Sequence, residues 1–402
     1  MITPGHRNFS QSKEKGLSMS DWRIALSDLD YGPEEEAAVL RVLKSKWLSM
    51  GPEVQAFEKE FGELVGAKYA LAVSNGTAAL HLSYLALGLG PGGEIIQPAV
   101  NFVAAANMTV AVGSTPVFAD IAAVDEPTID PKEIERRITP RTKAVVVMHY
   151  GGYLCRMAEI KEICERKGLF LIEDACHAVG AQYLDPRGKP PHKKMAGAIG
   201  DIACFSFFSN KNIAIGEGGM VVTNRDDLAE RLRLLRSHGM TTLTWDRHKG
   251  HARSYDVILN GYNYRLDELR AALGRSQLAK LKKNNERRRE LVSVYRKNLS
   301  SLPGWVIPFG AYSGDSACHL MVAVAPTEEV RLKTVENLNK NRIQTSLHYP
   351  FLPEMSAFKD RRWAKLARSV SFVSRVITLP LFPTLNLQQV EEICANIAHA
   401  QG

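Results

Sequence analysis

The sequence predicts an α/β fold: a large domain built on a mostly parallel seven-stranded sheet, followed by a smaller C-terminal α+β domain. Seven short β-rich runs alternate with helical patterns through the first two-thirds of the chain. These runs are continuously apolar, which is typical of strands buried on both faces of a parallel sheet. From about residue 265 the pattern changes to a long charged amphipathic helix and then to mixed helices and strands. The 402 residues are enough for two or three domains.

The predicted elements follow one another in a regular order. The seven strands are expected at 69–73, 94–97, 117–121, 144–148, 169–173, 202–207 and 220–223. Helices are indicated between them at 77–87, 101–112 and 157–167. The long helix over 265–297 precedes two strands, at 319–325 and 376–379, and two helices, near 329–341 and 387–400. We therefore predict a large domain over 21–265 and, over 266–402, the connecting helix with the small domain.

Composition indicates a cytoplasmic enzyme-sized protein. Residues 1–20 are polar, lack the apolar segment of a signal peptide and are predicted to be a disordered extension. No apolar run is long enough to span a bilayer, so no membrane partner is expected. The six cysteines are scattered and form no CxxC pair or His/Cys cluster. We therefore expect reduced thiols, with neither disulfides nor a metal site.

Two segments carry unusual charge or length. Residues 281–290, LKKNNERRRE, are the only dense basic patch in a chain of net charge +8. They are interpreted as the solvated face of a helix, and no nucleic-acid partner is expected. Residues 240–260 are too long and irregular for a simple connection, which indicates a functional loop.

Lys211 is the most informative single residue. It lies in the run 205–219, FSFFSNKNIAIGEGG, shortly after a predicted strand and with no charged neighbour before Glu217. An amine held against something other than water has a lowered pKa and can capture a carbonyl group. The alternative is a solvated lysine in a turn.

A small-residue turn follows the first predicted strand. Residues 74–78, SNGTA, lead directly into the helix predicted at 77–87. The N–H groups at such a helix start suit a phosphate. A helix start capped by Ser74, Asn75 or Thr77 explains the same residues without a ligand.

Two carboxylates end another predicted strand. Glu173 is the last residue of the run 169–173 and Asp174 follows it, so at least one of them is expected at the ligand edge of the sheet. There it could pair with a protonated ring nitrogen, and His177, about one helical turn further on, could reach the same ligand. The alternative is an Asp N-cap followed by a surface histidine.

Two further residues complete the set. Phe102 follows a strand end and could stack on an aromatic ring, although a buried core phenylalanine is the simpler interpretation. Ser206 lies five residues before Lys211, close enough to contact the phosphate of a ligand whose aldehyde the lysine attacks. A phosphate cradle, a stacking ring, a carboxylate for a ring nitrogen and a reactive amine together indicate a pyridoxal 5′-phosphate (PLP) site.

Four strings in order make the chain resemble the DegT/DnrJ/EryC1/StrS family of sugar aminotransferases. They are SNGTAALHL (74–82), EDACHAVGA (173–181), FSFFSNKNIAIGEGGMVVTN (205–224) and GYNYRLDELRAA (261–272). The resemblance runs from about residue 24 to the C-terminus. It implies the aspartate-aminotransferase-like fold, PLP fold type I, with PLP as cofactor.

The resemblance also implies roles for individual residues. Lys211 matches the lysine that binds the cofactor's aldehyde, and Asp174 matches the carboxylate that faces the pyridine nitrogen. The other cofactor contacts and two substrate contacts implied are Gly76, Thr77, Phe102, His177, Ser206, Asn263, His348 and Tyr349. Asn263 matches an asparagine that reaches the phosphate of the neighbouring subunit, so a homodimer with shared sites is expected.

The implied reaction is transamination. An amino group would pass from glutamate or glutamine to a keto-sugar, by a ping-pong Schiff-base mechanism, in the biosynthesis of a polysaccharide or an antibiotic. A nucleotide-linked 3- or 4-keto-6-deoxyhexose is the expected acceptor, and the Arg- and His-bearing segment 245–254 would suit its diphosphate. A keto-inositol is the alternative acceptor. A PLP-dependent dehydratase is disfavoured because histidine replaces the lysine in those relatives, and a non-catalytic regulator because every catalytic position is filled.

Overall fold

The computed structural model describes residues 22–185, 192–242, 250, 254–359 and 366–400. The predicted extension over 1–20 and most of segment 245–254 therefore lie outside the described residues.

A seven-stranded sheet forms the centre of the fold, in the order β1-β9-β8-β5-β4-β2-β3. Its strands are β1 (Tyr69–Val73), β2 (Glu94–Pro98), β3 (Thr115–Ala119), β4 (Thr142–Met148), β5 (Phe170–Asp174), β8 (Ile202–Ser206) and β9 (Gly219–Thr223). Only β9 runs against the others, between β1 and β8. All seven predicted strands are present within two residues of their expected bounds, and the mostly parallel sheet is confirmed.

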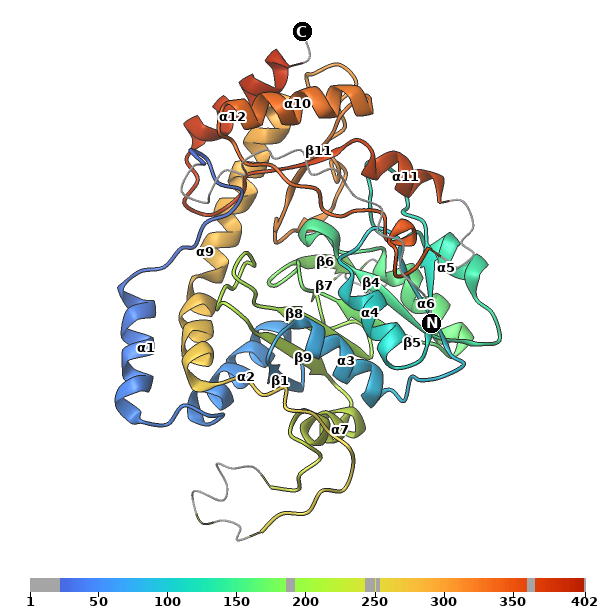
Figure 1. The fold of residues 1–402 in the computed structure, drawn as a ribbon, viewed down its shortest axis with the longest axis vertical. Coiled ribbons are helices and arrows are strands. Elements are labelled where there is room, and N and C mark those ends of the chain that lie inside the picture. Colours follow the sequence, from blue (N-terminus) through green and yellow to red (C-terminus); the bar gives the residue numbers. More distant parts are fainter. Residues whose placement is uncertain (1–21, 186–191, 243–249, 251–253, 360–365, 401–402) are drawn as a thin grey trace, which may run out of the picture.

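Helices cover both faces of this sheet (Figure 1). In β4, Val145 and Val147 belong to one core, whereas Ala144 and Val146 belong to the core on the other face. The first core includes α2 (Pro52–Val65) and α6 (Met157–Lys167); the second includes α3 (Gly76–Ala86), α4 (Ala104–Ala111) and α7 (Asp226–Arg236). Burial on both faces is the reason that the strands are continuously apolar.

The long helix α9 (Glu268–Leu299) connects the sheet region to the C-terminal elements (Figure 1). These are β10 (Gly314–Asp315), β11 (Met321–Val324), α10 (Glu328–Lys340), α11 (Ala367–Val373), β12 (Val376–Leu379) and α12 (Leu387–His399). The first described residues return to this part of the chain, because Ile24 forms a bridge with Ile343. The division at 265/266 stays a prediction. No described helix is both long and apolar enough to cross a membrane.

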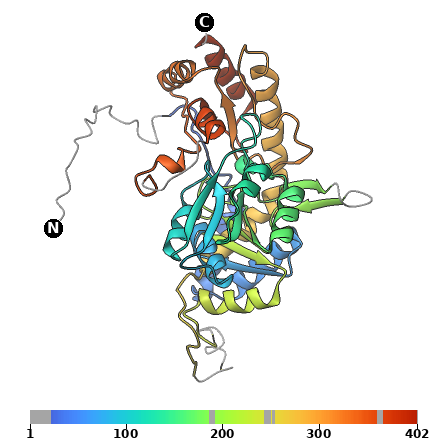
Figure 2. The same ribbon diagram turned by 90° about the vertical axis from the view of Figure 1, so that its right-hand side faces the viewer.

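Several elements were not among the sequence predictions. They are α1 (Pro33–Ser45), α2, α5 (Pro131–Arg137), α7, α11, the short helices Tyr150–Gly152 and Leu352–Glu354, and the strands β6 (Gln182–Asp185), β7 (His192–Met195) and β10. Strands β6 and β7 form a hairpin that projects from the body of the protein (Figure 2). This hairpin is short and polar, so it has no apolar run that would indicate a strand.

Two predictions need correction. The helix expected over 101–112 begins only at Ala104, because the Asn101 side chain accepts the Phe102 N–H at 2.6 Å and keeps this segment out of the helix. The basic patch 281–290 is solvated on one side only. Arg288 is 4% exposed and donates to the Leu381 carbonyl, because α9 packs against the C-terminal elements along this side.

Candidate active site

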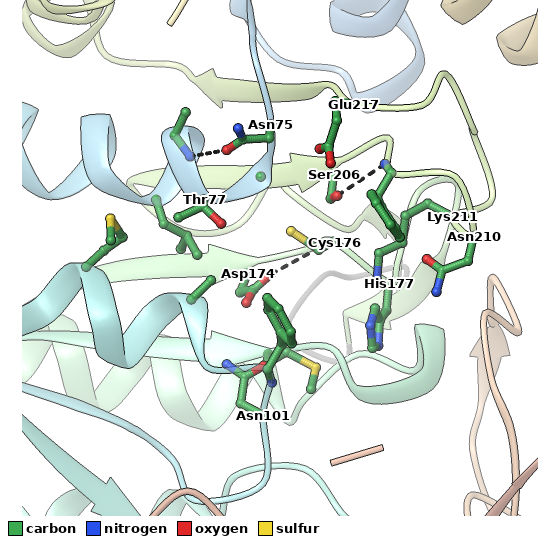
Figure 3. Close-up of a pocket in the computed structure, with 18 of the residues that line it drawn as sticks. Asn75, Thr77, Asn101, Asp174, Cys176, His177, Ser206, Asn210, Lys211 and Glu217 are labelled. Carbon is green, nitrogen blue, oxygen red and sulfur yellow. Dashed lines mark hydrogen bonds between the residues drawn. The ribbon is translucent and has the colours of Figure 1, made fainter. Parts of the chain in front are cut away.

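A cavity of about 550 Å³ opens at the carboxyl ends of the parallel strands, where ligands of α/β sheets bind (Figure 3). Residues that follow β1, β2, β5 and β8 line it, and the segment around His348 and Tyr349 closes it from the C-terminal part. Nine of the ten predicted site residues line this one cavity: Gly76, Thr77, Phe102, Asp174, His177, Ser206, Lys211, His348 and Tyr349.

The N-terminus of α3 forms one end of the cavity. Asn75 is the N-cap, and its Oδ1 accepts the Ala78 N–H at 2.8 Å. The N–H groups of Gly76 and Thr77 belong to the first helical turn and have no intrahelical acceptor. A Cβ at position 76 would lie 2.9 Å from the Ser206 Cβ, so glycine is required for this close approach. The capped start and the phosphate cradle are therefore compatible, because different N–H groups are involved.

The two carboxylates at the end of β5 face opposite sides. Asp174 is 5% exposed and lines the cavity, and one of its oxygens accepts the Cys176 N–H at 3.2 Å (Figure 3). Glu173 is turned away into the core, where it contacts His149 at 3.0 Å. The alternation of side chains along a strand separates them.

Lys211 lies in a loop that β8 and β9 hold closed. Phe207 donates its N–H to Gly218 and accepts from Ile215, so the loop folds back on its own start. Burial lowers the pKa of the Lys211 amine, although the thiol of Cys176 and the carboxylate of Asp174 oppose the shift. The amine expected from the sequence to be reactive is therefore enclosed beside the acid of the same cavity.

His177 is held as a neutral ring. Its Nδ1 accepts the Gly151 N–H at 3.3 Å, so its proton lies on Nε2, which donates to the Tyr349 hydroxyl at 2.8 Å. Burial, with the nearby Lys211 and His348, keeps the pKa of His177 well below its usual range. The residue lies in a turn, not on the helix that its spacing from Asp174 suggested, because residues 175–180 form successive turns after β5.

Phe102 is not a core residue. Its side chain is 53% exposed at the cavity, and its ring centroid lies 5.8 Å from that of Tyr349. Of the two interpretations left open by the sequence, the buried phenylalanine is wrong for the chain as described. The ring is available to a ligand.

Asn263 is the one predicted site residue outside this cavity. It is exposed and forms a bridge with Ser237, whereas its neighbour Tyr264 lines the cavity. Its expected role lies at the phosphate of a second subunit, which a single chain does not test.

Sequence reasoning missed several residues that line or adjoin the cavity. Asn101 is 2% exposed, and its Nδ2 has no partner among the described residues. The Oδ1 of Asn210 is also buried and has no hydrogen-bond partner among the described residues. Both could have been found from the sequence, because Asn101 directly precedes Phe102 and Asn210 directly precedes Lys211. His319 gave no such signal, because it lies 108 residues from Lys211 in the sequence. In the structure its Nε2 is 3.3 Å from the Lys211 amine.

Comparison with known proteins identifies the family. Residues 30–398 match the model of the DegT/DnrJ/EryC1/StrS aminotransferase family. The chain is 38% identical over 375 residues to the spore coat polysaccharide biosynthesis protein SpsC of Bacillus subtilis (strain 168), covering 90% of this chain and 93% of SpsC. Its fold superposes on PseC of Helicobacter pylori, an aminotransferase involved in the biosynthesis of pseudoaminic acid, with a TM-score of 0.86 and 31% identity. That match covers 94% of this chain and 98% of PseC.

A further solved relative is Spr1654 of Streptococcus pneumoniae in its PLP form, with a TM-score of 0.85 and 25% identity, over 94% of this chain and 98% of that protein. These matches extend over nearly the whole chain, including both the sheet region and the C-terminal elements. The chain therefore belongs to the DegT/DnrJ/EryC1/StrS family and is a sugar aminotransferase.

Proposed function

We propose that this aminotransferase holds PLP in the cavity and moves an amino group from glutamate or glutamine to a nucleotide-linked 3- or 4-keto-6-deoxyhexose. The observation that carries the proposal is the shared cavity of the Lys211 amine, the Asp174 carboxylate and the start of α3. These are an aldehyde-binding amine, a partner for a ring nitrogen and a phosphate site in one enclosed space.

The phosphate fits at the start of α3. The N–H groups of Gly76 and Thr77 and the Ser206 hydroxyl converge there, and the helix end adds a partial positive charge. The absent side chain of Gly76 leaves room for the close approach.

Phe102 and His177 would hold the pyridine ring of PLP, and Asp174 would face its nitrogen. A carboxylate that is 5% exposed holds a proton on a ring nitrogen more strongly than water would. Phe102 offers an exposed face for stacking, and the Tyr349 hydroxyl fixes the ring of His177. The free Nδ2 of Asn101 is a further donor for a ligand in this space.

Bound PLP supplies an aldehyde for the amino group and a ring that takes up the electrons released at the substrate carbon. Lys211 would hold the aldehyde of the bound group, and its Nζ, once released, would accept a proton from the donor's α-carbon. In the second half of the cycle Nζ returns a proton to the carbon of the acceptor. The lowered pKa of Lys211 favours the neutral amine that this role requires.

Lys211 is also the residue that favours transamination over dehydration. The dehydratases of the family carry histidine at this position, and the residues next to it here are Asn210 and Asn212. The SpsC match, to a polysaccharide biosynthesis protein, supports a sugar acceptor over a keto-inositol.

The active form is proposed to be a cytoplasmic homodimer with shared sites. Asn263 supports this, because it is exposed next to Tyr264, which lines the cavity, and is free to extend toward the phosphate of a second copy.

Absorbance and turnover of the native protein and Lys211→Ala test the proposal. With PLP the native protein should show a visible band that glutamate or glutamine shifts, and it should aminate one member of a panel of keto-sugar nucleotides. Lys211→Ala should lose the band and at least about 10⁴-fold in turnover. Lys282→Ala, on the exposed side of α9, should match the native protein.

Two results would contradict parts of the proposal separately. A Lys211→Ala variant that keeps the band and the turnover would refute the assigned mechanism. Turnover of a free keto-inositol, with no keto-sugar nucleotide accepted, would refute the acceptor class alone.

A further inference from the structure

Among the described residues, the side chain of His319 lies within hydrogen-bond range of the Lys211 amine, with Nε2 and Nζ 3.3 Å apart. It is 4% exposed and precedes β11. Its N–H donates to the Gly151 carbonyl at 2.8 Å, and Gly152 leaves no room for a Cβ beside its backbone. The backbone of His319 is therefore fixed against the segment that also holds His177.

A chain of side-chain amides determines which ring nitrogen of His319 carries the proton. Asn285 donates its Nδ2 to the Val179 carbonyl at 2.9 Å, so its Oδ1 is the atom that faces Asn212. Asn212 donates its Nδ2 to that Oδ1 at 2.8 Å and to the Ala317 carbonyl at 2.7 Å. Because carbonyl groups only accept, both amides have a single possible orientation.

The Oδ1 of Asn212 then faces Nδ1 of His319 at 3.0 Å and must accept from it. The neutral ring therefore carries its proton on Nδ1 and presents the lone pair of Nε2 to Lys211. The amine must turn an N–H toward this lone pair, because two lone pairs would repel each other. The lone pair of the amine is thereby left to point away from His319.

The groups that face His319 keep it neutral. Burial lowers its pKa well below the usual range, and the neighbouring Lys211, His177, Arg288 and His348 lower it further. The ring therefore keeps its one proton on Nδ1, accepts a hydrogen bond at Nε2 and takes up no second proton at neutral pH.

We infer that His319 is a positioning residue, which fixes the Lys211 amine by accepting a hydrogen bond from it, and that Asn212 and Asn285 lock the ring for this purpose. The inference rests on the proposed function, since Lys211 is the residue that His319 would position. It assigns a role to a side chain contributed by the C-terminal part of the chain, beyond the predicted domain division.

Two substitutions of His319, by glutamine and by asparagine, distinguish its role as a hydrogen-bond acceptor from a role in packing. Glutamine can place its Oε1 near the position of Nε2, whereas asparagine reaches only the position of Nδ1 and leaves Lys211 without an acceptor. PLP is added to the cofactor-free protein, and the rate of appearance of the visible band is measured. His319→Asn should be about 10-fold slower than the native protein and His319→Gln within about threefold, because one hydrogen bond to the amine is lost or kept.

Pyridoxine phosphate controls for the rest of the site, because it lacks the aldehyde that reacts with Lys211. Its affinity should be the same in all three proteins. Under turnover with glutamate, His319→Asn should lower kcat and leave the KM for glutamate unchanged. If His319→Asn does not fold, His319→Met, which fills a similar volume without an acceptor of comparable strength, takes its place.

A band that forms equally fast in the native protein and in His319→Asn would overturn the inference. Equal slowing in the Asn and Gln variants, or weaker pyridoxine phosphate binding in His319→Asn, would assign His319 a packing role and overturn it as well. A native protein that forms no band with PLP would instead refute the proposed function, which is a separate result.

Discussion

Glu173 and Asp174 are adjacent buried carboxylates at the end of one strand, yet their hydrogen-bond partners differ. Glu173 is fully buried and accepts four hydrogen bonds, from His149 and from the N–H groups of Gly197, Ile199 and Gly200. Asp174 accepts the Cys176 N–H, and its carboxylate lines the cavity. A satisfied carboxylate holds the fold together, whereas an unsatisfied one is available to a ligand.

The buried histidines differ in the same way. His149 contacts the carboxylate of Glu173, and its other nitrogen accepts the Cys155 N–H at 3.3 Å. His319 contacts an amide on one side and the Lys211 amine on the other. The first ring has only structural partners, and the second lies between the fold and a reactive group. The partner, and not the burial, distinguishes the two kinds of histidine.

The largest expected effect in this comparison is that of substituting Asp174, the carboxylate that lines the cavity. Asp174→Asn should lower kcat on the order of 10²–10³-fold, because an amide cannot hold a proton on a ring nitrogen as a carboxylate does. The free energy of unfolding of the cofactor-free protein should change little, since Asn keeps an oxygen for the Cys176 N–H. Steady-state turnover and urea unfolding measure the two quantities. Turnover within threefold of the native value would remove Asp174 from the proposed site.

Glu173→Gln should have the opposite profile. The amide would place an NH₂ group against N–H donors, so the unfolding free energy should fall by about 3–5 kcal/mol, as when a buried pair is broken. The fraction of the Glu173→Gln variant that remains folded should keep the kcat of the native protein. Asp174→Asn is the matched control, one residue away. Unchanged stability in Glu173→Gln would refute the structural role of this carboxylate.

The pH dependence of Glu173 gives a second check on its role. Burial alone would raise its pKa, but the hydrogen bonds from His149 and the backbone lower it overall. A carboxylate whose pKa is lowered by folding stabilises the protein above its unfolded pKa, and the effect is lost as the pH falls through the folded pKa. The difference in unfolding free energy between the native protein and Glu173→Gln should therefore shrink in acid.

The central sheet was predictable because its signal is local. The runs that form β4 and β5 are apolar over consecutive residues, and burial on both faces produces that pattern directly. The hairpin of β6 and β7 was missed because neither strand has a continuous apolar run, although Tyr183 packs into the core beside the sheet. The burial of one side of the basic patch 281–290 was missed, because the burial of Arg288 depends on what α9 packs against.

The site was predictable wherever a residue follows a strand end. Asp174 and Ser206 end β5 and β8, and parallel strands bring such ends to one edge. Which of Glu173 and Asp174 faces the cavity was not decided from the sequence, because it depends on which face of the sheet the cavity adjoins. His319 could not be found at all, since 108 residues separate it from Lys211 and only the packing of the C-terminal part brings them together.

The smallest expected effect concerns His348, a partly buried ring. Its Nδ1 contacts the Thr378 hydroxyl at 3.0 Å, and burial, with the nearby Lys211, lowers its pKa to about 4. A histidine kept neutral by folding stabilises the protein above its unfolded pKa of about 6.5, and this contribution is lost as the pH falls toward the folded pKa. At about pH 5 the loss should be roughly 2 kcal/mol, with His177 and His319 adding losses of the same sign.

Urea unfolding of the cofactor-free protein at several pH values from neutral to about pH 5 measures this loss. His348→Gln should retain more of its neutral-pH stability in acid than the native protein does, because it has one less group to protonate on unfolding. His399→Gln, on the exposed end of α12, should follow the native curve and serves as the matched control. Parallel curves for the native protein and His348→Gln would mean that His348 titrates alike in the folded and unfolded chains. The loss of stability in acid would then be confined to His177 and His319, whose tautomers are fixed by hydrogen bonds from or to an amide.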